Sequence, residues 1–212
     1  MLNSFRNFFA NDKVFLTSTV IAAIGSLLNG VNVIVTTRRY FTGVVSFFLV
    51  ACIIIMYTSY VHHEKNVMKG MIGTYLGIKV VFNTYVICTA VTNLTIFKIP
   101  FTALDISSAV SLVISILFTI NHYLINSDHH SNPTRVFLNQ LLIIVNAIEV
   151  IVVYASVLSQ STVGGSLLNS IVVVICGIGA VVSYNVVACI ETRLDVYRVE
   201  REANGWKPED SK

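Results

Sequence analysis

The sequence predicts an all-α, polytopic membrane protein, built as a bundle of six transmembrane helices. Hydrophobic residues make up 55% of the 212 residues and charged residues only 12%, about half the charged fraction of a typical soluble domain. The hydrophobic residues also gather into six runs of 22 to 24 residues, each long enough to cross roughly 30 Å of hydrocarbon. Together these observations exclude a large soluble catalytic domain.

The six runs are expected to be helices because of their length. In chain order they cover residues 14–36, 40–61, 70–93, 104–126, 136–158 and 167–190. The first run follows Lys13 but is too long for the apolar core of a secretory signal, so we expect it to be a retained span. Several runs are rich in Val, Ile and Thr, which favour strands in water. In lipid each segment must satisfy its own backbone hydrogen bonds, so runs of this length favour helices.

Lysine and arginine residues in the short loops indicate the orientation. With the N-terminus inside, the inner segments carry ten of them: Arg6, Lys13, Lys65, Lys69, Arg135, Arg193, Arg198, Arg201, Lys207 and Lys212. The outer loops carry three: Arg38, Arg39 and Lys98. The asymmetry predicts that both termini are cytoplasmic, with the Arg38–Arg39 pair as the main observation against it.

The pattern divides the chain into a transmembrane bundle over residues 1–190 and a cytoplasmic amphipathic tail over residues 191–212. Ile190, Leu194 and Tyr197 recur at helical spacing, which predicts that the last helix continues to about Ala203. The tail carries five basic and six acidic residues, so it does not resemble a polybasic lipid anchor. We expect it to contact a protein, either in a homo-oligomer or in a larger membrane complex. The net charge of +3 reflects membrane orientation and indicates no nucleic-acid partner.

A faint threefold repetition relates pairs of spans. The odd spans open on a basic residue followed by apolar residues, and the even spans close on polar, aromatic-containing stretches. Three helical hairpins would produce this pattern. So would the basic residues and aromatic belts that six-span proteins generally carry at these depths.

Two charged residues, Lys79 and Glu149, lie well inside predicted spans. A charge near the bilayer centre costs roughly 2.5 to 3.5 kcal/mol on insertion scales, so we expect both to face the bundle interior. Asn83 and Asn146 share helix faces with them, and Asn29 adds an amide at similar depth. One interpretation is a structural ion pair that joins the third and fifth spans. The other is a solute or ion pathway in which Glu149 binds a cation or proton.

Histidines form a second group, expected at the cytoplasmic face together with Asp128: His62, His63, His122, His129 and His130. Their nitrogens could supply ligands for zinc or iron. No HExxH motif is present, and the four cysteines show no CxxC spacing, so the pattern favours a wetted, pH-sensitive loop and no metal or other cofactor. Gly73 and Gly77 form a small-xxx-small pair, typical of a close helix contact.

Three functions are compatible with this sequence. The leading hypothesis is a small transport or channel protein, or a transporter subunit, with a polar path near Lys79 and Glu149. The second is a structural or accessory subunit whose polar residues hold helices together and whose tail binds a partner. The third is a membrane enzyme that uses the cytoplasmic histidines.

Overall fold

The regular elements of the described residues are α-helices, without strands. The computed structural model describes residues 7–37, 40–100, 103–127, 141, 144–145, 148 and 167–203. The long helices are α2 (Asp12–Thr37), α3 (Tyr40–Val61), α4 (Lys65–Phe97), α5 (Ala103–Ser127) and α7 (Leu167–Ala203). The all-helical class expected from the sequence is therefore confirmed for this part of the chain.

Four helical segments are long and apolar enough to cross a membrane: Asp12–Asn32, Tyr40–Val61, Lys65–Phe97 and Val174–Leu194. Helix α5 contributes a shorter apolar stretch, Ser108–Tyr123. The predicted run 136–158 lies outside the described residues, apart from four helical positions within it. The structure thus supports a membrane protein by length and composition, while the count of six spans and their orientation stay predictions.

Local sequence explains where these helices begin and end. The Asn11 side chain accepts a hydrogen bond from the Lys13 backbone N–H at 2.9 Å, as an N-cap residue does, so α2 begins directly after it. At the other end of α4, Lys98 adopts the left-handed conformation and its N–H bonds to the Asn93 carbonyl. Pro100 follows two residues later and cannot continue a helix. Helix α7 runs on to Ala203, as predicted from its apolar spacing.

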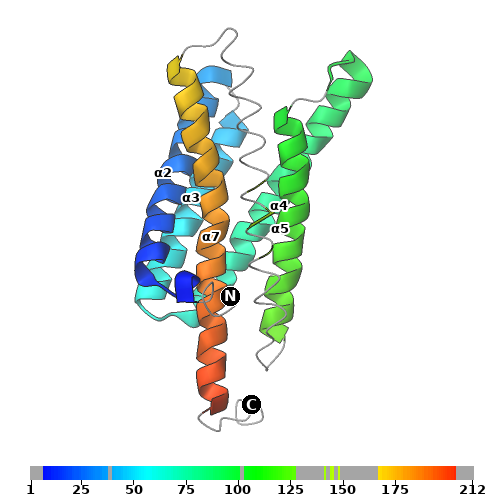
Figure 1. The fold of residues 1–212 in the computed structure, drawn as a ribbon. Helices are drawn as coiled ribbons and strands as arrows, with labels where there is room; N and C mark the ends of the chain where they lie inside the picture. Colours follow the sequence, from blue (N-terminus) through cyan, green and yellow to red (C-terminus); the bar gives the residue numbers. More distant parts are fainter. Residues whose placement is uncertain are drawn as a thin grey trace.

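The helices form an up-and-down bundle (Figure 1). Helix α2 lies between α3 and α7, and α4 packs against both α3 and α5. Helix α7 also reaches α3 and α4 through smaller contacts. Sequential neighbours are antiparallel, but α5 and α7 run in the same direction (Figure 1).

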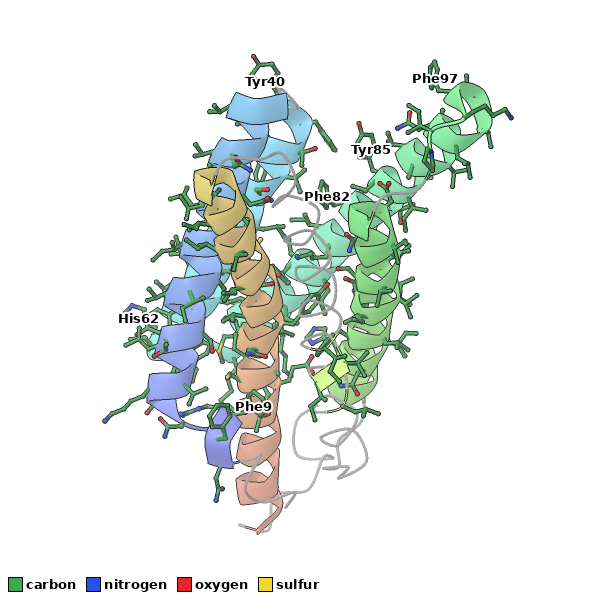
Figure 2. All side chains as sticks on the ribbon, turned by 45° about the horizontal axis from the view of Figure 1, so that its top comes forward. Phe9, Tyr40, His62, Phe82, Tyr85 and Phe97 are labelled. Carbon is green, nitrogen blue, oxygen red and sulfur yellow. The ribbon has the colours of Figure 1, made fainter. Side chains whose placement is uncertain are left out.

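Apolar side chains cover the outside of the bundle as well as its core. Buried residues such as Phe15, Ile53 and Ile72 fill the centre. Tyr85 and Phe97 of α4 are 49% and 65% exposed and lie toward the far end of that helix (Figure 2), where the Tyr85 ring contacts Phe41 of α3. Helices that are apolar on all sides are typical of membrane spans.

Helices α2 and α7 approach each other closely at a pair of glycines. A Cβ atom on Gly25 would overlap the Cα of Gly179, and a Cβ on Gly179 would overlap Gly25 in turn. Backbones approach this closely only where both residues lack a side chain.

The pair Gly73–Gly77, expected to make such a contact, does not make one among the described residues. A Cβ atom on Gly77 would meet nothing within 4 Å, and a Cβ on Gly73 would meet only His122 Nε2, at 3.9 Å. The described helices therefore do not confirm that expectation, and most of the predicted run 136–158 lies outside the described residues.

We expect Gly25→Ala to destabilise the bundle, since the added methyl group meets backbone that cannot rotate away. Overpacking of this kind costs about 1 to 3 kcal/mol. Thermal unfolding in detergent should show a lower midpoint than for the wild type. The matched control is Gly77→Ala, which adds a methyl group to open space on α4 and should leave the midpoint unchanged or raise it. Equal effects of the two substitutions would contradict a specific contact at Gly25.

Candidate functional site

Buried polar side chains gather where α4, α5 and α7 face one another. All of the following are at most 5% exposed: Asn83, Ser115, Asn121, His122, Ser183, Glu191 and Thr192. Burying a polar group in an apolar surrounding costs free energy unless it is hydrogen-bonded. The partners of these groups therefore show how the site is built.

A tyrosine–serine network links the three helices. The Tyr75 hydroxyl of α4 donates to Ser183 Oγ of α7 at 2.6 Å. The Tyr184 hydroxyl lies 2.6 Å from Ser115 Oγ and 3.2 Å from Ser111 Oγ, both on α5. Each tyrosine presents an apolar ring to the core and a hydroxyl to a partner, so neither leaves a buried polar atom without a hydrogen bond.

Lys79 lies against this network. Its Nζ atom is 5.8 Å from the centroid of the Tyr75 ring and 5.3 Å from that of Tyr184. Both distances are within the range of cation–π attraction, which is stronger away from water. One turn further along α4, Asn83 Nδ2 donates to Ser111 Oγ at 3.1 Å. Lys79 and Asn83 therefore both lie on the side of α4 that faces α5 and α7.

His122 of α5 and Glu191 of α7 form a buried pair. His122 Nδ1 lies 2.9 Å from Glu191 Oε1, and their side chains are 4% and 0% exposed. The distance is that of a hydrogen bond, and which atom donates depends on the tautomer of the ring. The other ring nitrogen, Nε2, is directed toward Gly73 of α4.

We refer to these groups together as the polar column: Asn83, Ser111, Ser115, Tyr75, Lys79, Ser183, Tyr184, His122 and Glu191. His122 follows Ser111 by eleven residues on α5, a rise of about 16 Å along the helix. That is roughly half the thickness of the hydrocarbon layer. The Phe118 ring stacks on Tyr184, with centroids 5.4 Å apart, and divides the network from the His122–Glu191 pair.

An arginine on α7 shows where along the bundle the polar column ends. Arg193 donates to the Ala10 carbonyl at 2.5 Å and to the Asp12 carboxylate, and it lies over the Tyr60 ring at 4.8 Å. This cluster joins the start of α2, the end of α3 and α7 at one level. Glu191 is two residues before Arg193, so the buried pair lies just inside that end of the bundle.

The other three residues expected near Lys79 are not part of the polar column as described. Asn29 Nδ2 donates to Ser46 Oγ at 3.3 Å, across the contact between α2 and α3. Asn146 and Glu149 lie outside the described residues, so the proposed pairing of Lys79 with Glu149 stays a prediction.

The histidines do not form one group in the described part of the chain. His62 and His63 are exposed in the turn after α3, and His62 lies at the outer edge of the bundle (Figure 2). His122 is buried on α5 beside Glu191. Among described residues, no three His, Cys, Asp or Glu side chains are placed to hold a metal ion. Asp128, His129 and His130 lie outside these residues.

Glu191 is the residue that the sequence interpretation missed. We expected it to begin the aqueous tail, yet it is 1% exposed and Thr192 beside it is buried as well. A signal was available in the spacing: Glu191 follows Tyr184 by seven residues, which places both on one face of a helix. Its partner His122 is 69 residues earlier, so the sequence does not show that they pair.

Comparison with known proteins adds no further information on the site. No protein-family profile matches the chain, and no curated protein or solved structure is significantly similar to it.

The buried pair should show strong energetic coupling. His122→Leu removes the imidazole that contacts the buried carboxylate of Glu191, and we expect a loss of about 3 to 5 kcal/mol of stability. Glu191→Leu should cost less, and the double substitution should cost less than the sum of the two. A double-mutant cycle on unfolding in detergent measures this coupling. His62→Leu, at an exposed position, is the control and should change stability by less than ~0.5 kcal/mol.

A second cycle tests the expected midplane pair. If Lys79 and Glu149 interact, Lys79→Met and Glu149→Gln should be non-additive by more than ~0.5 kcal/mol in thermal unfolding. The physical reason is that each single substitution leaves one charge in the bundle without its partner. Additive effects would show that the two charges lie in different surroundings.

Proposed function

We propose that this chain is a small integral membrane transport or channel protein, or a subunit of one, whose path follows the polar column. The observation that carries this proposal is the His122–Glu191 pair, which places two titratable groups inside an apolar bundle. Ionisable residues within membrane spans are rare and commonly mark ion paths and proton relays. An imidazole exchanges protons readily near neutral pH, which suits a relay.

The arrangement of the column supports movement through the bundle rather than at its surface. On the other side of the Phe118 ring from the pair, hydroxyls of Ser111, Ser115 and Tyr184 extend toward Lys79 and Asn83. Helices α5 and α7 contact each other through polar side chains of this column. In the proposed path, Glu149 adds a second carboxylate opposite Lys79.

The parallel direction of α5 and α7 supports the six-span arrangement within this proposal. Ser111 and Ser115 contact Tyr184, while His122, further along α5, contacts Glu191, further along α7. Two spans of one chain run parallel only if the chain crosses the membrane an odd number of times between them. The predicted run 136–158 would be that crossing, and both termini would then lie on the same side, in the cytoplasm.

A structural or accessory role is the second candidate, and the Arg193 cluster favours it. Arg193, Asp12 and Tyr60 hold three helices together at one end, outside the proposed path. The polar column could in the same way serve only to join α4, α5 and α7. Transport experiments separate the two functions.

The proposal predicts proton movement across a membrane that contains the purified protein. In proteoliposomes with a pH-sensitive dye inside, a potassium diffusion potential should drive proton uptake faster than in empty vesicles. Glu191→Gln and Glu149→Gln should each lower the rate at least about tenfold, because an amide cannot exchange a proton. Glu64→Gln, which changes an exposed carboxylate in the turn before α4, should retain the wild-type rate.

Two results would contradict this function. Uptake equal to that of empty vesicles, with folded protein present, would favour the structural role. Full uptake in a stable Glu191→Gln variant would remove the buried pair from the path. Protein recovery and thermal unfolding of each variant must be measured in parallel, so that loss of fold is not read as loss of transport.

A further inference from the structure

An aromatic ring, that of Phe118 on α5, divides the polar column. Ser115 and His122 lie seven residues apart on this helix, a rise of about 10 Å. Phe118 comes three residues after Ser115 and four before His122, so all three side chains share one face of α5. The ring therefore lies between the hydroxyl network and the His122–Glu191 pair.

Packing holds this ring in place. Phe118 is fully buried, and its ring stacks on that of Tyr184 with centroids 5.4 Å apart and planes inclined by 15°. Tyr184 is itself anchored, because its hydroxyl lies 2.6 Å from Ser115 Oγ. The two stacked rings thus join α5 to α7 at the level where the column is divided.

Helix α7 is also apolar at this level. Val187 and Ala188 lie between Tyr184 and Glu191, on the face of the helix that these two residues share, and both are at most 1% exposed. They belong to the same apolar core as Phe118. A proton passes between groups that are hydrogen-bonded directly or through water, at roughly 3 Å for each step. Crossing the apolar level along the column therefore requires water to enter where the ring now lies.

We propose that Phe118 is the gate of the path. With its ring stacked on Tyr184, water is excluded and the buried pair is separated from the hydroxyl network, whereas rotation of the ring away from Tyr184 connects them. Hydrophobic constrictions gate channels by excluding water in this way. The inference rests on the proposed transport function and adds to it the residue that limits the rate. The structure describes the closed arrangement.

Proton uptake into proteoliposomes tests the gate. Phe118→Ala removes the ring and leaves room for water between Ser115 and His122. Minor conformations are commonly populated to about 0.1 to 10%, so a variant that does not wait for the ring to rotate should take up protons at least about tenfold faster than the wild type. Phe118→Leu keeps a smaller apolar side chain, and its rate should lie between those of Phe118→Ala and the wild type.

Two further variants separate gating from general loosening of the bundle. Phe15 on α2 is a phenylalanine of similar burial, and its ring contacts Tyr57 and Tyr60 of α3, a helix that contributes no residue to the polar column as defined. Phe15→Ala removes the same ring and should leave the uptake rate unchanged. Combining Phe118→Ala with Glu191→Gln should abolish the added uptake, because the opened path still passes the buried carboxylate.

The outcomes for the gate and for transport can be told apart when thermal unfolding shows that each variant is folded. If the wild type takes up protons and neither Phe118 variant is faster, the path bypasses the ring, and the gate is disproved while the transport function stands. Equal acceleration by Phe15→Ala, or acceleration that persists with Glu191→Gln, also disproves the gate. If no protein exceeds empty vesicles, the transport function fails and the gate with it. Should Phe118→Ala not fold, Phe118→Leu provides the same comparison with a smaller change in volume.

Discussion

Close contact between α2 and α7 at Gly25 and Gly179 is the constraint on which the bundle depends. Lipid chains are as apolar as leucine, so burial of apolar surface does little to drive helices together within a membrane. Packing of bare backbone and polar contacts must supply the attraction. Gly30 and Gly43 likewise allow the backbones of α2 and α3 to approach each other closely. With α2 held on both sides, α3 and α7 occupy defined positions around it.

The remaining helices are attached by different means. Helix α4 packs on α3 and α5 packs on α4, while among the described residues α5 meets α7 mainly through long polar side chains. The bundle thus has one side joined by glycine contacts and another joined by tyrosines, serines and the His122–Glu191 pair. Lys79 and the His122–Glu191 pair lie on the second side, where hydrogen bonds rather than backbone contact hold the helices. Hydrogen bonds can exchange partners without separating packed backbones, and the proposed path follows this side of the bundle.

The sequence allowed the helices to be predicted because the bilayer sets their length. The bounds expected for α3 agree with the structure, and those for α5 differ by one residue at each end. The inward position of Lys79 was also expected, since a charge must avoid lipid. Contacts between distant segments could not be predicted: Gly73 and Gly77 have the spacing of a contact pair, but the contact is made by Gly25 and Gly179. Likewise, a glutamate at the end of an apolar run looks like a membrane boundary until its histidine partner is known.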